Sequence, residues 1–156
     1  MLFRSPRSGT LPPSGGGSGC FLSGTPILLA DGSLKPIEAV KVGDLVMAFD
    51  EKTKTLKQNK VKETFTHEAE NYLIINGSLK VTENHPVYSE GQWVEIGTLE
   101  VGDELLNAQG ELTIITSIQR VKEKAQVYNL EVNRYHTYIA GGIVVHNKAK
   151  VDPNLP

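Results

Sequence analysis

The sequence contains little cysteine, no long apolar run and no excess of positive charge. Cys20 is the single cysteine among 156 residues, which excludes an internal disulfide and a multi-cysteine zinc site. Sixteen Lys and Arg stand against eighteen Asp and Glu, so the formal net charge is -2. Because a basic surface is needed to neutralise a phosphate backbone, we expect no nucleic-acid partner.

The longest apolar runs, such as residues 26–30, span only a few residues, whereas a membrane-spanning helix needs about 20. The first twenty residues contain two arginines but no apolar stretch typical of a secretory signal. We therefore expect no membrane partner. The sequence leaves open whether the domain works in the cytoplasm or within a larger secreted protein.

The two ends of the chain differ in composition from its middle. Residues 1–19 consist largely of Ser, Gly and Pro without a hydrophobic period, and residues 148–156 are also poor in apolar groups. Such segments bury too little surface to offset the entropy that is lost on ordering. We predict a flexible flank at 1–19, one folded domain over 20–147 and a second flank at 148–156.

The middle of the chain is typical of short strands separated by turns. The hairpin signal Asn76-Gly77 lies between two apolar segments, and both of its residues tolerate positive φ. No segment keeps a 3.6-residue apolar period over three turns, so the sequence predicts an all-β fold. The expected strands are 27–30, 45–49, 61–66, 72–75, 79–82, 87–89, 93–96, 105–107, 112–118, 127–132, 137–140 and 143–145.

An internal repeat relates the two halves of this region. Residues 37–44 (IEAVKVGD) match residues 96–103 (IGTLEVGD) at a constant offset of 59 residues. Upstream of each copy, Thr25-Pro-Ile aligns with His85-Pro-Val. Two copies of one β unit predict a pseudo-twofold architecture. In such an arrangement Cys20 and His85 would converge on one cleft.

Cys20 begins the folded region, directly after a Gly/Ser-rich flank. A lone cysteine is more often a core residue than a nucleophile, but Gly19 leaves the preceding carbonyl sterically open. A thiol at this place can attack its own upstream peptide bond in a five-membered rearrangement. His85, taken alone, is as often structural as functional. It can nevertheless protonate the departing amide nitrogen, and the Thr82 hydroxyl can hydrogen-bond the same amide.

The last apolar strand ends at His146-Asn147. Asn at a strand end is usually a turn former, yet its side-chain amide can attack its own carbonyl, form a succinimide and cleave the chain after itself. His146 can polarise that carbonyl or assist the leaving amine. His136 lies on the strand that is expected to pair with the last one. His67 has no such context, and we interpret it as a solvated surface residue.

Together these features resemble the Hint (hedgehog/intein) superfamily over residues 20–147. The matching segments are 20–26 (CFLSGTP), 37–44, 82–86 (TENHP), 127–138 (VYNLEVNRYHTY) and 142–147 (GIVVHN). The chain is most similar to bacterial intein-like domains and to the Hint domains that precede toxin modules in bacterial secreted proteins. The resemblance implies a horseshoe-like β fold in which both termini meet at one active site.

The resemblance also implies autocatalysis in a single turnover. An N–S acyl shift would occur at Cys20, and Asn147 would cyclise. The first step would be promoted by Thr82 and His85, the second by His136 and His146. The substrate would be the flanking polypeptide of the same chain, and we expect a monomer that needs no cofactor.

Two positions depart from the pattern of splicing inteins. Lys148 follows the cyclising asparagine, where a splicing intein has Cys, Ser or Thr as acyl acceptor. Asn129 stands where many splicing members have an aspartate, and an amide cannot serve as the acid or base of the transfer step. Both differences favour cleavage over ligation, so we expect little or no splicing.

Two other functions remain open on the sequence alone. The chain could be a Hint-fold spacer or binding module without activity, in which case the full-length protein would survive purification. It could also bind a metal through Cys20, His85 and His146, since thiolate and imidazole suit Zn²⁺. A dedicated structural site is not expected with one cysteine, but the predicted convergence makes inhibition by Zn²⁺ an expectation.

Overall fold

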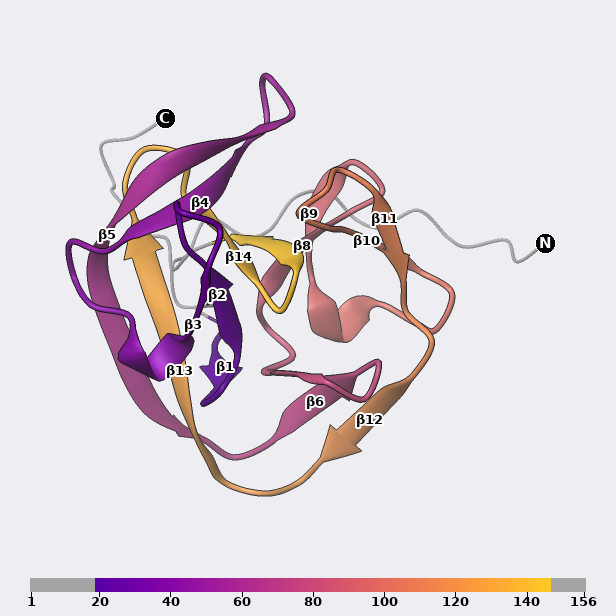
Figure 1. Ribbon diagram of the computed structural model, residues 1–156. Helices are drawn as coiled ribbons and strands as arrows, with labels where there is room; N and C mark the ends of the chain where they lie inside the picture. The colour runs from indigo at the N-terminus through magenta and orange to yellow at the C-terminus, as the bar shows by residue number, and fades with distance from the viewer. Residues whose placement is uncertain (1–18, 147–156) are drawn as a thin grey trace, which may run out of the picture.

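The computed structural model describes residues 19–146, which fold into short β-strands with two 3-10 helices (Figure 1). The first part of the chain contains β1 (Phe21–Leu22), β2 (Pro26–Leu28), β3 (Leu34–Pro36), η1 (Ile37–Ala39), β4 (Leu45–Asp50), β5 (Thr55–Ala69), β6 (Tyr72–Ile75) and β7 (Leu79–Val81). The second part contains β8 (Pro86–Ser89), β9 (Gln92–Glu95), η2 (Ile96–Thr98), β10 (Glu104–Leu106), β11 (Leu112–Ile114), β12 (Ile118–Val121), β13 (Ala125–Val132), β14 (Thr137–Ala140) and β15 (Ile143–His146).

Three antiparallel sheets contain these strands, which confirms the predicted all-β fold. A seven-stranded sheet has the order β12-β6-β7-β1-β13-β5-β4, a six-stranded sheet has the order β3-β2-β14-β15-β8-β9, and β10 pairs with β11. Figure 1 shows the long strands β5 and β13 side by side, along one edge of the molecule. Over the described residues, we find no helix with the length and apolar character to cross a membrane.

The largest differences between the predicted and the observed strands are three, and the remaining boundaries differ by no more than two residues. β5 is far longer than the predicted 61–66, because its first half pairs with β4 and its second half with β13. The predicted strand at 112–118 is two strands, β11 and β12, which lie in different sheets. Between them the buried Ile115 donates its N–H to the Asp103 carbonyl at 2.8 Å. β1 and β3 were not predicted, since two or three residues show no alternation.

The internal repeat appears as two matching local structures. Each copy begins with a 3-10 helix, η1 or η2, and then closes a turn with an aspartate. The Asp44 carboxylate accepts the Lys41 N–H at 2.9 Å, and the Asp103 carboxylate accepts the Glu100 N–H at 2.7 Å. The hairpins β2–β3 and β8–β9 form the two ends of the six-stranded sheet. These equivalences confirm the predicted pseudo-twofold architecture.

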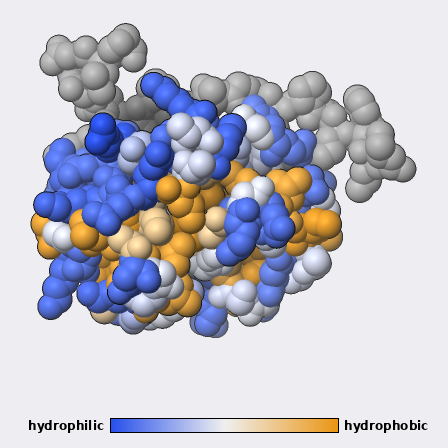
Figure 2. All heavy atoms as spheres, turned by 45° about the horizontal axis from the view of Figure 1, so that its top comes forward, coloured by the Kyte–Doolittle hydropathy of each residue, from blue (hydrophilic) through white to orange (hydrophobic). Residues whose placement is uncertain are grey.

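The main apolar core holds the beginning of the described chain in place. Phe21 in β1 is fully buried in this core, and its ring lies 6.3 Å from that of Tyr138 in β14. Burial of a phenylalanine contributes about 2–3 kcal/mol, so the packing of Phe21 also fixes its neighbour Cys20. Figure 2 shows apolar surface (orange) through the middle of one face, with polar regions around it. Val42 and Val101, at equivalent positions of the repeat, are among the exposed apolar side chains.

Candidate active site

The pairing of β1 places Cys20 between two polar side chains. β1 lies between β13 and β7 in the seven-stranded sheet. Continuing the two antiparallel registers by one residue brings Cys20 beside Asn129 of β13 and beside Thr82, which follows β7. Cys20 and Asn129 are 1% exposed and Thr82 is 9% exposed. The sheet thus encloses the first residue of the predicted domain on both sides.

Thr82 holds the backbone of Cys20 through two hydrogen bonds. The Cys20 N–H donates to Thr82 Oγ1 at 2.8 Å, and the Thr82 N–H donates to the Cys20 carbonyl at 2.9 Å. The Thr82 hydroxyl lies 3.3 Å from the Cys20 carbonyl oxygen and 2.8 Å from Asn84 Oδ1, and its single hydrogen goes to the nearer acceptor, Asn84. Its lone pairs therefore remain available to the Cys20 amide. Thr82 thus contacts the Cys20 amide, as predicted from the sequence.

Asn129 holds the carbonyl of the same peptide bond. Its Nδ2 donates to the Gly19 carbonyl oxygen at 2.6 Å. Its Oδ1 accepts the Tyr138 hydroxyl at 2.6 Å and the Leu130 N–H at 2.8 Å. Burial, and then the neighbouring charge of Cys20, raise the pKa of Tyr138 well above its usual value, so this hydroxyl remains a donor. Two donors on Oδ1 fix the orientation of the amide and direct its NH₂ group at Gly19.

Gly19 lies directly against the backbone of His85. A Cβ added at Gly19 would lie 2.1 Å from the His85 Cα and 2.4 Å from its nitrogen, so a larger residue would displace one of the two segments. The His85 N–H donates to the Thr82 carbonyl at 3.2 Å, which ties this segment to the loop after β7. Because residue 19 has no side chain, the peptide bond between Gly19 and Cys20 can lie close to His85.

The His85 ring is fully buried, and it reaches the other end of the described chain. Its Nε2 lies 3.1 Å from the His146 carbonyl oxygen. Because a carbonyl only accepts, Nε2 carries the hydrogen and Nδ1 keeps a lone pair. Nδ1 is buried without a hydrogen-bond partner. Burial lowers the pKa of His85 from 6.5 to about 3, although its contact with the Gly19 backbone opposes this shift. The ring is neutral at neutral pH.

We expect His85 to make the domain less stable in acid. Its pKa is 6.5 ordinarily and about 3 in the fold, so below pH 6.5 the unfolded chain binds a proton that the folded chain does not. The free energy of unfolding should fall by about 1.4 kcal/mol per pH unit in this range, or about 3 kcal/mol on going from neutral pH to about pH 4.5. Urea unfolding measures this loss. His85→Gln keeps a donor toward the His146 carbonyl and should lack this part of the pH dependence. An equal loss in both proteins would assign the acid sensitivity to other groups.

His136 and His146 meet where β14 pairs with β15. Their rings are nearly parallel, with centroids 6.4 Å apart. His136 has a positive φ of 58°, in the turn between β13 and β14. On another side, the His146 ring packs edge-on against Trp93 of β9 at 5.1 Å. The two histidines thus occupy the end of β15, directly before Asn147.

The structure brings five of the six predicted site residues to the two ends of the described chain. Cys20, Thr82 and His85 surround the upstream peptide bond, and His136 and His146 lie at the end of β15. The sixth, Asn147, and also Lys148, lie outside the described residues. Within residues 19–146, no three His, Cys, Asp or Glu side chains are grouped to hold a metal ion. Cys20, His85 and His146 do not form such a group in this part of the chain, and inhibition by Zn²⁺ stays a prediction.

Two residues at this site, His67 and Asn129, make contacts that the sequence did not predict. His67 was interpreted as a surface residue, and it is exposed, but its Nδ1 lies 3.8 Å from Cys20 Sγ. Asn129 was interpreted only as the loss of an acid or base, yet it contacts the Gly19 carbonyl. Asn129 lies within the matching segment 127–138, and this position was the signal in the sequence for a role at the site. Nothing near His67 in the sequence indicates its contact.

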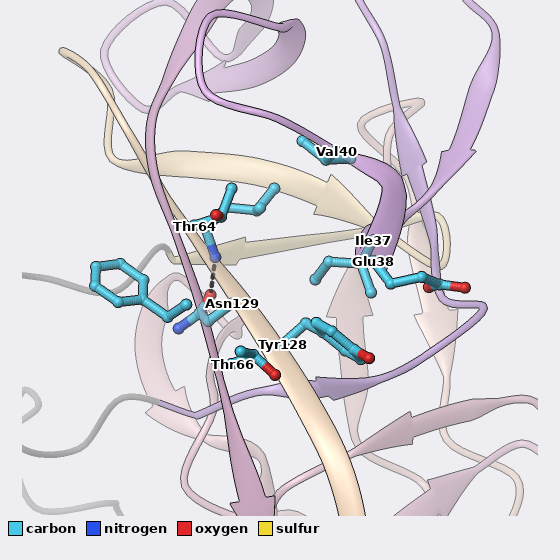
Figure 3. Close-up of a pocket in the computed structure, with 9 residues that line it drawn as sticks. Ile37, Glu38, Val40, Thr64, Thr66, Tyr128 and Asn129 are labelled. Carbon is cyan, nitrogen blue, oxygen red and sulfur yellow. Dashed lines mark hydrogen bonds between the residues drawn. The ribbon is translucent and has the colours of Figure 1, made fainter.

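Two hollows flank the strand β13 and its neighbours. One of about 190 Å³ lies between η1 and the strands β5 and β13, and Figure 3 shows Ile37 and Tyr128 facing each other across it. Asn129 also lines this hollow, but alternation along β13 directs its side chain to the opposite face from that of Tyr128. The other hollow, of about 290 Å³, is lined by His67 and Thr82 among others, and so lies next to the Cys20 site.

Comparison with known proteins agrees with this geometry. A family model described as the pretoxin Hint domain matches residues 27–149. The solution structure of a bacterial intein-like domain from Clostridium thermocellum is 35% identical, covers 82% of this chain and 98% of its own, and has a TM-score of 0.76. A DnaB intein from Synechocystis sp., 23% identical, covers 83% of this chain and 99% of its own with a TM-score of 0.69, and shares the fold. A search of curated proteins gave no match. This chain belongs to the pretoxin Hint domain family, and it is similar in structure to bacterial intein-like domains and inteins.

Proposed function

We propose that this domain cleaves its own chain in a single turnover, by an N–S acyl shift at Cys20 and by cyclisation of Asn147. The observation that carries the proposal is that His85 contacts both Gly19 and His146, the residues that directly precede Cys20 and Asn147. Its backbone packs against Gly19, and its ring bonds to the His146 carbonyl. Membership in the pretoxin Hint family supports the same chemistry. The substrate is the flanking polypeptide, and the residues named here need no cofactor.

The first step converts the peptide bond between Gly19 and Cys20 into a thioester. Sγ, once deprotonated, attacks the Gly19 carbonyl carbon, the C–N bond breaks, and the Cys20 nitrogen gains a proton and becomes an amine. Thr82 Oγ1 holds this nitrogen at 2.8 Å. His85 Nδ1, which has a lone pair at neutral pH, takes up a proton during the step and passes it to this nitrogen, and with a pKa of about 3 the protonated ring gives up that proton readily. An external thiol or water then attacks the thioester and releases residues 1–19.

Asn129 supplies the charge stabilisation for this step. Attack by sulfur converts the Gly19 carbonyl oxygen into an oxyanion, and the Asn129 NH₂ group is already 2.6 Å from that oxygen. The amide is held by Tyr138 and Leu130 before the reaction begins, so no reorganisation is needed as charge develops. Asn129 is therefore a catalytic group in this proposal, although it cannot transfer protons.

The second step cleaves after Asn147. The side-chain nitrogen of Asn147 attacks its own carbonyl carbon, the bond to Lys148 breaks, and the Lys148 nitrogen leaves as an amine with one added proton. In this proposal His136 and His146, whose rings are stacked at the end of β15, transfer the protons of this step. Lys148 offers no usual acyl acceptor, so the two cleavages proceed without joining the flanks.

An intact-mass spectrum of the full chain at neutral pH, recorded over time with and without added thiol, tests the proposal. We expect thiol-dependent loss of residues 1–19 and loss of residues 148–156 that leaves a chain one water lighter than simple hydrolysis would. A product joining Gly19 to Lys148 should be absent or minor. A chain that stays whole under both conditions would instead identify a Hint-fold module without activity.

Replacing Asn129 with leucine should slow the upstream step by about 10²–10³-fold at neutral pH, the range for loss of one oxyanion-hole donor. Leucine has a similar volume, but it has no group that can donate to the developing oxyanion. The measurement is the rate of thiol-dependent release of residues 1–19, with release of residues 148–156 as the internal control of folding. A wild-type rate in Asn129→Leu at neutral pH would remove Asn129 from the mechanism.

A further inference from the structure

The buried thiol of Cys20 has an exposed histidine against it. His67 Nδ1 lies 3.8 Å from Cys20 Sγ, within the distance of a hydrogen bond to sulfur. His67 is near the end of β5, whose neighbour β13 separates it from β1 in the sheet. Leu22, Val127 and His67 form one row across these three strands, and Cys20 lies two residues before Leu22 on the same face. The contact is thus set by sheet order and register.

His67 connects the thiol with solvent. Cys20 is 1% exposed, whereas His67 is exposed and lines the hollow of about 290 Å³. Thr82 and Asn84, which are hydrogen-bonded to each other beside Cys20, line the same hollow. The charged groups facing this hollow are Glu70 and Glu83, and Glu83 is paired with Arg120 at 3.0 Å. A proton that leaves Sγ toward His67 therefore has an open way out.

We infer that His67 is the base that deprotonates the Cys20 thiol. His85 lies on the other side of the peptide bond, with its backbone at Gly19 and its ring at the His146 carbonyl. A thiol is a weak nucleophile until it is ionised, and burial opposes ionisation. The contact between Nδ1 and Sγ provides an acceptor for the thiol proton at the place where it is needed.

In this step the Cys20 sulfur loses one proton and the Cys20 nitrogen gains one. The thiol proton passes from Sγ to His67 Nδ1 as Sγ attacks the Gly19 carbonyl carbon. The bond between Gly19 and the Cys20 nitrogen breaks, and that nitrogen gains one proton through His85. His67 then gives its proton to solvent, and His85, which took up the proton that it passed on, is neutral again as it was at the start. This assignment rests on the proposed function, because it names the base of its first step.

Full-length variants of His67 test the assignment by their pH profile and by chemical rescue. His67→Ala should slow thiol-dependent release of residues 1–19 by about 10²-fold or more at neutral pH, within the range for a positioned general base. The rate of the variant should rise steeply with pH, because hydroxide replaces the missing base. Added imidazole should restore part of the rate, since the hollow beside the deleted ring is open to a small base.

The matched control is Glu68→Gln, at the next position of β5, whose side chain is exposed and points to the other face of the strand. It should keep the wild-type rate and show no response to imidazole. A wild-type rate in His67→Ala, or a slow rate without rescue and with an unchanged pH profile, would overturn the assignment. If residues 1–19 are not released from the wild type, or are released equally from Cys20→Ala, the proposed function itself fails, and this is distinguishable from failure of His67 alone.

Discussion

Replacing Cys20 with alanine should abolish the thiol-dependent release of residues 1–19, because the chain has no second thiol that could form the thioester. Burial holds Cys20 in place directly after Gly19, and alanine fills the same place without a nucleophile. Time-resolved intact mass in the presence of thiol measures the effect. The downstream release of residues 148–156 should persist in this variant, since the two cleavages use different nucleophiles.

Cys20→Ser is the matched control for this substitution. Its hydroxyl keeps the volume and polarity of the site but ionises far less readily than a thiol, so an ester should form more slowly. Hydroxylamine, which cleaves esters and thioesters, should release residues 1–19 from the serine variant but not from the alanine variant. Release of the same fragment at the same rate from Cys20→Ala would exclude an acyl shift and point to proteolysis.

Much of the fold could be predicted because its signals are local. Turn residues such as Asn76-Gly77 define a hairpin within a few positions, and the repeat fixes two matching 3-10 turns through Asp44 and Asp103. The repeat also brought Cys20 and His85 together in the prediction, and the structure places Gly19 directly on the His85 backbone. These predictions needed only the order of residues along the chain and the constant 59-residue offset of the repeat.

The rest depends on which strands become neighbours. His67 and Cys20 are 47 residues apart, and they meet only because β13 inserts between β1 and β5 with one register. Asn129 donates to Gly19 across 110 residues for the same reason. A shift of that register by one residue would turn both side chains to the opposite face of the sheet. Nothing in the local sequence specifies this pairing.

The groups around the peptide bond between Gly19 and Cys20 are neutral. Thr82 holds the nitrogen, Asn129 holds the carbonyl oxygen, and burial keeps His85 uncharged at neutral pH. A buried charge without a partner would destabilise the fold, whereas neutral dipoles can already be fixed in position before charge develops. Thr82, Asn129 and His85 are buried, whereas His67 is exposed, which is why we place the exchange of protons with solvent there.

Replacing Asn147 with alanine should abolish the release of residues 148–156. In an unstructured peptide this cyclisation is slow, because the side chain rarely meets its own carbonyl in attack geometry. Here the residue before it is held from two sides: β15 pairs His146 with Thr137, and the His146 carbonyl contacts His85 Nε2 at 3.1 Å. The backbone that leads into Asn147 therefore starts from a fixed position, which favours attack. Intact mass over time measures the loss of the nine-residue segment.

Lys148→Ala is the matched control, because it changes the leaving residue but keeps the nucleophile and should still be cleaved. His146→Ala should slow the release without moving the cleavage site, since it removes one of the two stacked imidazoles but leaves the amide of Asn147. The mass of the remaining chain decides between mechanisms: a terminal succinimide is one water lighter than the product of proteolysis. If Asn147→Ala still lost residues 148–156, the bond would be broken by a different nucleophile, and the contact of His85 with His146 would have to serve the fold alone.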